Sequence, residues 1–141
     1  MPAYSRNLNL AAYQSVAVHG GVAMDDPHRL VLMLMDGALQ RLSAARGAVE
    51  RNDIGQKAQL LQRCGAIITE LRASLDTQRG GALALNLDDL YEYMERQLLR
   101  ANVENRVSYL DEISGLLTEV RSAWVAIAPG ATPAAGRGAL R

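Results

Sequence analysis

Towards the end of the chain, apolar residues recur at steps of three and four positions, a pattern that strongly restricts the fold. The residues are Val107, Leu110, Ile113, Leu117, Val120, Trp124 and Ile127. This spacing places all of them on one face of an α-helix, and its heptad-like form favours antiparallel packing at small crossing angles. We therefore expect a helix that starts at Asn105 and is stopped by Pro129.

Two earlier segments predict a pair of long helices. Asp26 suits the N-cap of the first, and Pro27 suits its first helical position. Asp53 and Gln56 have the spacing of a capping box, which predicts a short turn before the second helix. The second helix is expected to end at residues 79–81, because glycine adopts the left-handed conformation that terminates helices. The apolar stripe of the first is Leu30, Leu34, Ala38, Leu42, Ala45 and Val49, and that of the second is Leu60, Leu61, Cys64, Ile67, Ile68, Leu71 and Leu75.

The segment from Asn86 to Asn105 predicts another helix, with Asn86 as its N-cap and two aspartates in its first turn. Its apolar stripe comprises Leu87, Leu90, Tyr91, Met94, Leu98 and Ala101. Tyr93 and Leu99 fall outside this stripe, which indicates that the helix touches more than one neighbour.

The fold class that follows is all-α: an antiparallel up-down four-helix bundle with an N-terminal cap segment and a disordered C-terminal tail. Phe is absent although 49% of the residues are hydrophobic, and a core of aliphatic residues suits packed helices. We assign residues 1–24 to an N-terminal arm or cap, 25–128 to the bundle, and 129–141 to a tail rich in Ala, Gly and Pro.

Several classes of function are disfavoured by composition and motifs. Fifteen basic and fifteen acidic residues leave no net charge, so we expect no nucleic-acid partner, and no run is long enough for stable membrane insertion. A single cysteine, Cys64, and the absence of a secretory signal fit a reducing compartment. No P-loop, zinc-binding cysteine pair or Glu-x-x-His motif is present, so we expect neither an enzyme nor a metal or other cofactor.

Several blocks resemble the flagellin export chaperones of the FliS family, in matching order from about Leu10 to Pro129. The blocks are Tyr13-Gln14, Asp26-Pro27-His28-Arg29-Leu30, Leu34-Met35-Asp36-Gly37-Ala38, Gly80-Gly81, Asn86-Leu87, Leu90-Tyr91-Glu92-Tyr93-Met94 and Leu98-Leu99-Arg100-Ala101-Asn102. Met35 departs from the pattern, because the family usually has an aromatic residue there. The tail beyond Pro129 also has its own composition.

The resemblance implies a chaperone in the bacterial cytosol. Such a protein binds the disordered C-terminal segment of flagellin, prevents premature polymerisation, and delivers its cargo to the flagellar type III export apparatus, including the export gate. The leading alternative is a regulatory helical-bundle adaptor that binds a non-cargo protein through the same apolar groove. A homodimer without cargo is a further possibility, because exposed apolar grooves favour self-association.

The candidate flagellin-binding residues are Leu10, Tyr13, Leu32, Met33, Tyr91, Tyr93, Met94 and Leu98. We hypothesise that the arm, through Leu10 and Tyr13, covers part of the groove until cargo displaces or rearranges it. On the residues alone, a cap over the protein's own core is the commoner role of such an arm. Leu39 and Leu99 are also possible groove residues, but core or helix-edge packing is the favoured interpretation for both.

Overall fold

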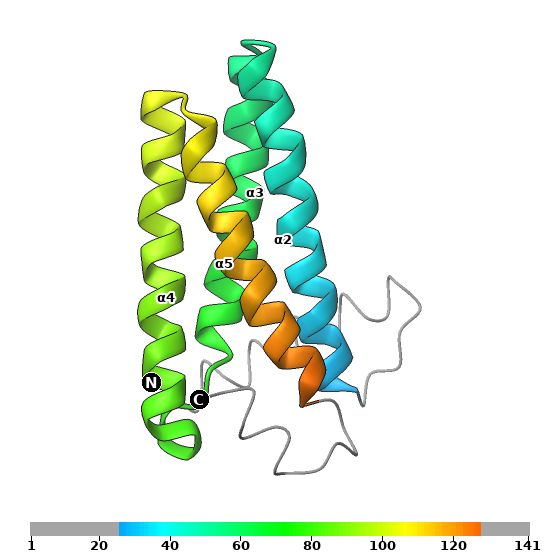
Figure 1. The fold of residues 1–141 in the computed structure, drawn as a ribbon, viewed down its shortest axis with the longest axis vertical. Coiled ribbons are helices and arrows are strands. Elements are labelled where there is room, and N and C mark those ends of the chain that lie inside the picture. Colours follow the sequence, from blue (N-terminus) through cyan, green and yellow to red (C-terminus); the bar gives the residue numbers. More distant parts are fainter. Residues whose placement is uncertain (1–25, 128–141) are drawn as a thin grey trace.

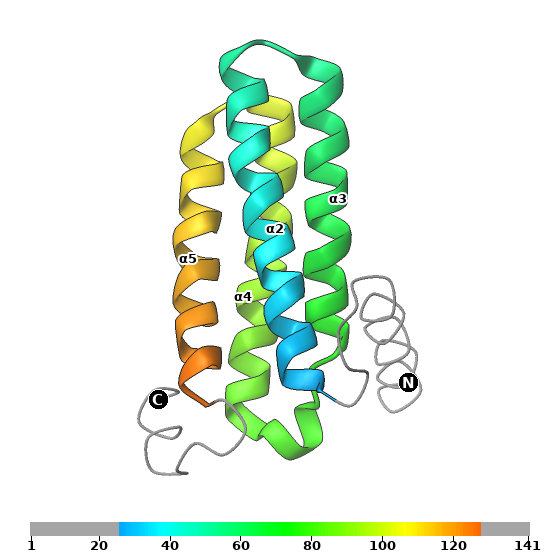
Figure 2. The same cartoon turned by 90° about the vertical axis from the view of Figure 1, so that its right-hand side faces the viewer.

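The computed structural model describes residues 26–127, which form four α-helices joined by short turns (Figure 1). The helices are α2 (Pro27–Glu50), α3 (Ile54–Ala73), α4 (Thr77–Glu104) and α5 (Val107–Ala126). α2 packs against α3 and α5, and α4 packs against the same two helices. Figure 2 shows this arrangement, with α2 in front of α4 and the other two helices on either side. The predicted antiparallel four-helix bundle is thus confirmed for the described residues.

The starts of α2 and α3 follow the predicted capping. The carboxylate of Asp26 accepts a hydrogen bond of 3.0 Å from the backbone N–H of Arg29, and Pro27 is the first residue of α2. The carboxylate of Asp53 accepts one of 3.1 Å from the N–H of Gln56. Each bond satisfies a backbone donor that a helix start would otherwise leave without a partner.

The predicted boundaries on either side of α4 are wrong. α3 ends at Ala73, where the hydroxyl of Ser74 donates to the carbonyl of Leu71, and not at residues 79–81. A new helical segment starts at Thr77, and Gly81 (φ 55°, ψ −132°) bends the chain before α4 continues. Asn86 therefore lies inside α4 and is not an N-cap, because the helical segment that follows the non-helical Gly81 has already begun before it.

Asn105 was predicted both to end the helix that contains Asn86 and to start the last helix. It directly follows the end of α4, as expected, but α5 begins only at Val107. The φ of Asn105 is +57°, and its N–H donates to the carbonyl of Ala101 over 2.9 Å. This is the left-handed residue that commonly terminates a helix, and Asn tolerates the conformation better than most side chains. Arg106 then precedes α5 without a side-chain cap.

The core contains buried residues from all four helices. They are Met35, Ala38, Leu42, Ala45, Leu61, Cys64, Ile68, Leu71, Tyr91, Met94, Leu98, Ala101, Leu110, Ile113 and Leu117. The centre of the α5 stripe is buried as predicted, whereas Val120 and Trp124 are only partly buried. Burial raises the pKa of the Cys64 thiol to about 12, against the opposing effect of the Arg41 charge. The bundle therefore has a tightly packed centre and a more open end.

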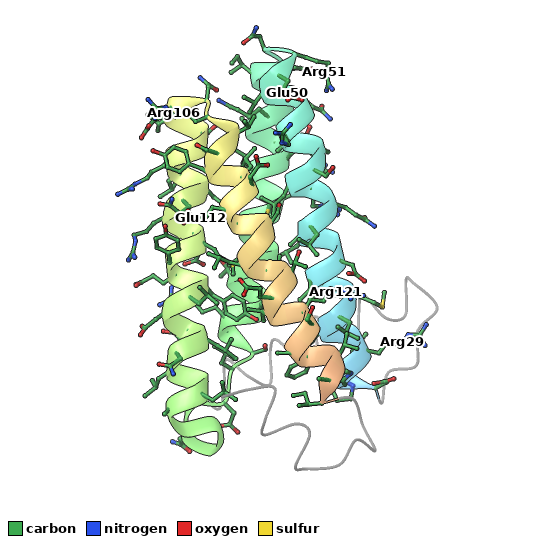
Figure 3. The ribbon with its side chains drawn as sticks, in the orientation of Figure 1. Arg29, Glu50, Arg51, Arg106, Glu112 and Arg121 are labelled. Carbon is green, nitrogen blue, oxygen red and sulfur yellow. The ribbon has the colours of Figure 1, made fainter. Side chains whose placement is uncertain are left out.

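Two ion pairs tie α2 to α5 along one side of the bundle. The guanidinium of Arg121 lies 2.6 Å from the carboxylate of Asp36, and that of Arg46 lies 2.9 Å from Asp111 (Arg121 is labelled in Figure 3). On the α4–α5 side, Glu112 accepts hydrogen bonds from the hydroxyl of Tyr93 and the amide of Gln97. Tyr93 therefore contacts α5, which explains why a large aromatic residue occurs outside the main apolar stripe of α4.

Candidate functional site

An apolar cavity of about 660 Å³ opens at the end of the bundle where α2 and α4 begin and α3 and α5 end, the lower end in Figure 1. We call it the end cavity. Its lining comes from all four helices and from the loop before α4: Pro27, His28, Val31, Met35, Leu71, Ser74, Leu75, Asp76, Gly80, Leu83, Ala84, Leu87, Tyr91, Val120, Trp124 and Ile127. Most of these side chains are apolar, so the cavity suits apolar groups of a partner.

An aromatic pair joins two of the helices that line the end cavity. The rings of His28 and Trp124 are stacked, with centroids 4.9 Å apart and an interplanar angle of 8°. The Nε2 of His28 lies 2.6 Å from the carbonyl oxygen of Trp124, and the Nε1–H of Trp124 donates to the carbonyl of His28 over 2.9 Å. A carbonyl can only accept, so the Nε2 carries a proton. The pair fixes the first turn of α2 against the last turn of α5.

A second apolar hollow, of about 380 Å³, runs between α3 and α4. We call it the α3–α4 groove. It is lined by Ala58, Leu61, Gln62, Gly65, Thr69, Glu95, Leu98, Leu99 and Asn102. The side chain of Leu99 is 68% exposed, and Val103, one turn further along α4, is 79% exposed. No residue lines both hollows.

An ion cluster on α3 and α4 separates the two hollows. The guanidinium of Arg72 lies 2.6 Å from the carboxylate of Asp88, 3.0 Å from that of Glu95 and 3.6 Å from that of Glu92. The hydrogen bond to Asp88 is the main reason why the pKa of Arg72 is raised above its usual value. The neighbours of this cluster along the chain, Leu71 and Leu87, already line the end cavity.

The structure divides the predicted site residues among different surroundings. Tyr91 lines the end cavity, Leu98 lines the α3–α4 groove, and Met94 between them is fully buried in the core. Tyr93 meets α5 through Glu112. The remaining candidates are Leu32 and Met33, which are partly buried on α2, and Leu10 and Tyr13, which lie outside the described residues.

From the sequence we favoured core or helix-edge packing for Leu39 and Leu99, and the structure treats these two residues differently. Leu39 packs against the core, as expected. Leu99 does not, because it is largely exposed and lines the α3–α4 groove. Sequence reasoning also missed His28 and Trp124 as wall residues of a cavity. Trp124 carried one available signal, since it is the only tryptophan and lies near the end of the clearest stripe.

The fold and its two apolar hollows define a helical bundle suited to holding apolar segments of other proteins. A family model described as flagellar protein FliS matches residues 9–131, so the chain belongs to the FliS family. This membership makes it a flagellar export chaperone and not an enzyme.

Relatives of similar length support the assignment. The chain is 51% identical over 112 residues to flagellar secretion chaperone FliSB of Pseudomonas aeruginosa, covering 79% of this chain and 89% of the relative. It is 40% identical over 124 residues to flagellar secretion chaperone FliS of Salmonella typhimurium, covering 87% and 92%. The FliS chaperone of Vibrio cholerae is 37% identical over 121 residues, with coverage of 86% and 89%.

Two features are absent from the described part of the chain. Within residues 26–127, no helix combines the length and hydropathy that a bilayer crossing requires. Over the same range, no three His, Cys, Asp or Glu side chains form a group that could hold a metal ion.

Proposed function

We propose that this protein binds the disordered C-terminal segment of flagellin in the bacterial cytosol, prevents its premature polymerisation, and delivers it to the flagellar type III export apparatus. The observation that carries the proposal is the end cavity, which offers a preformed apolar surface in a protein of a secretion chaperone family. Contact with the export gate follows when cargo is bound.

The energetics of such a complex suit a reversible carrier. A disordered apolar segment gains a place to bury its side chains when it folds as a helix in a groove of the bundle. A helix that buries roughly 500 Å² of apolar area gains on the order of 12 kcal/mol before the cost of ordering is subtracted. The binding free energy that is left after this cost supports tight binding that export can still reverse.

The N-terminal arm has a role in the same proposal. Residues 1–24 precede Asp26 and Pro27, and Pro27 itself lines the end cavity, so Leu10 and Tyr13 are within reach of it. In our proposal the arm covers the cavity in the free protein and cargo displaces it. Tyr13→Ala should then bind the flagellin segment more tightly, whereas Tyr4→Ala should not change the affinity. An unchanged affinity in a helical Tyr13→Ala protein would refute the role of the arm.

Calorimetric titration with the C-terminal segment of the flagellin from the same organism tests the cargo assignment. We expect a stoichiometry near one to one, a negative heat-capacity change, and more helicity than the sum of the parts. Leu83→Ser should weaken binding by about tenfold or more, because Leu83 lines the end cavity and a polar group would replace an apolar contact. Leu85→Ser is the matched control, since Leu85 lies on the same helix, is 55% exposed and does not line the cavity.

The outcomes separate this function from the alternative. If the wild-type protein does not bind the flagellin segment, the cargo assignment fails and the regulatory adaptor becomes the better interpretation. If both leucine variants bind like the wild type, flagellin is the cargo but the end cavity is not its site.

A further inference from the structure

We propose that residues 75–80, which connect α3 to α4 and form the first turn of α4, are a hinged flap that pivots about Gly81 and opens the floor of the end cavity to a partner. We call this segment the cavity flap. The inference rests on the proposed function, because it takes the end cavity as the cargo site. Three observations support it: the burial of the cavity floor, the geometry of Gly80 and Gly81, and the contacts that hold the other walls in place.

The floor of the end cavity is buried, whereas its rim is not. Rim residues such as Leu83 are partly exposed. Leu71, Ala84 and Tyr91 also line the cavity, yet each is at most 5% exposed. Apolar side chains of a partner gain free energy at this floor only when their atoms come within contact distance of it. One wall of the cavity must therefore move before a partner reaches the floor.

Gly81 has the geometry of a hinge. Its φ of 55° and ψ of −132° are not helical, so the chain changes direction at this residue within α4. Glycine has no Cβ and passes between backbone conformations at little cost. A few such residues at the end of an element absorb the backbone rotation when a flap or lid moves. On the other side of the turn, Leu75 and Asp76 belong to no helix and supply the second hinge.

Gly80 shows how the cavity flap closes. A Cβ built on Gly80 would lie 2.7 Å from the Cβ of Ala84, and carbon atoms that are not bonded to each other do not approach so closely. The backbone of the flap thus rests directly on the buried wall of α4. The N–H of Gly80 donates to the carbonyl of Asp76 over 2.7 Å. Both partners of this hydrogen bond lie within the flap, so the bond persists when the flap rotates as a unit.

The other walls of the end cavity are tied together by polar contacts. Beyond Gly81, α4 is held against α3 by Arg72, whose guanidinium lies 2.6 Å from the carboxylate of Asp88. The stacked rings and two hydrogen bonds of His28 and Trp124 join α2 to α5. Rotation of the flap leaves both sets of contacts intact. The cavity flap is therefore a wall that can open without separating any two of the four helices.

Electron–electron double resonance between two spin labels on the full chain measures the opening. The labels are attached to Gln78→Cys in the flap and Ser122→Cys on α5, which are both exposed positions. Burial raises the pKa of the Cys64 thiol to about 12, so this cysteine stays unlabelled. When the flagellin segment binds, we expect the distance between the labels to lengthen by about 5 Å, the length of one helical turn. The matched control carries Asn86→Cys, beyond Gly81, in place of Gln78→Cys, and its distance to position 122 should not change.

Gly80→Ala tests the flap without cargo. Its methyl group has no room beside Ala84, so the flap must move away from α4. In the free variant, we expect the labels at Gln78 and Ser122 to show the lengthened distance of the cargo complex. The variant should also bind the flagellin segment at least about threefold more tightly, because opening then takes no share of the binding free energy. Gly115→Ala is the matched control: a Cβ there meets nothing within 4 Å, and neither the distance nor the affinity should change.

The outcomes separate the flap from the cargo assignment. If the segment binds in titration but the label distance stays that of the free protein, the flap is refuted and the cargo assignment stands. If both label pairs lengthen alike, α4 moves as a whole and the hinge at Gly81 is refuted. If the segment does not bind, the proposed function fails, and the free Gly80→Ala protein still tests the flap: an unchanged label distance there would overturn it. If Gly80→Ala loses its helicity, the labelled complex of the otherwise unchanged chain decides.

Discussion

Replacement of His28 by alanine should destabilise the bundle by about 1–2 kcal/mol, because it removes the contact that holds α2 against α5 at the end cavity. The stack with Trp124 is worth about 0.5–1.5 kcal/mol and the hydrogen bond from Nε2 about 1 kcal/mol. Both residues are only partly buried, which lowers the sum. The carbonyl of Trp124 also accepts a weaker bond of 3.3 Å from the N–H of Ile127, so the variant leaves no unsatisfied acceptor.

Denaturant unfolding followed by far-ultraviolet circular dichroism measures this loss without relying on the altered tryptophan signal. His28→Phe is the informative companion, since a phenyl ring retains a stacking surface but cannot donate to the carbonyl of Trp124. We expect it to recover about half of the lost free energy. A cost below about 0.3 kcal/mol for His28→Ala, or an equal cost for both variants, would refute the reasoning.

Other changes test other parts of the structure. Gly81→Ala should cost about 1–2 kcal/mol through backbone strain, because φ is +55° there, whereas Gly115→Ala should stabilise the protein by about 0.5–1 kcal/mol in thermal unfolding. Met94→Ala should cost about 2–5 kcal/mol because it empties space in the core, and Leu99→Ala less than about 0.5 kcal/mol, so similar losses in denaturant would contradict the assigned burial. Burial raises the pKa of Cys64 to about 12 from 9.0, so the folded protein keeps a proton that the unfolded chain releases. Stability should therefore fall as the pH rises above about 9, by up to about 1.4 kcal/mol per unit from this thiol, and this contribution should be absent from Cys64→Ala.

The parts of the fold that could be predicted are those encoded by neighbouring residues. The caps at Asp26 and Asp53 need only a carboxylate and the N–H groups two or three residues further on. The apolar stripes likewise need only the helical repeat. The failed boundaries have the same local origin: Gly81 permits both a helix end and a kink, and Asn105 serves equally well before or after a helix. Contacts elsewhere in the bundle decide between these options.

The candidate site was harder to predict because its walls come from distant parts of the chain. His28 and Trp124 are 96 positions apart, and nothing in either local sequence indicates that they stack. From the sequence, Tyr91 and Leu98 belong to one apolar stripe and are both candidate flagellin-binding residues. The structure separates them because each meets a different set of neighbours: Tyr91 lies where all four helices open, and Leu98 lies opposite Gly65.

The arrangement of α4 explains how one small bundle can be stable and still offer apolar surface to partners. Met94 is fully buried and belongs to the core, whereas Tyr91 and Leu98, on either side of it, each have one edge in a hollow. A partner segment that occupies either hollow thus covers the edge of Tyr91 or Leu98, and the core around Met94 stays packed. Since interiors packed at this density resist rearrangement, binding at these surfaces requires no opening of the core. Changes at Leu83 should consequently alter binding while the unfolding transition stays close to that of the wild type.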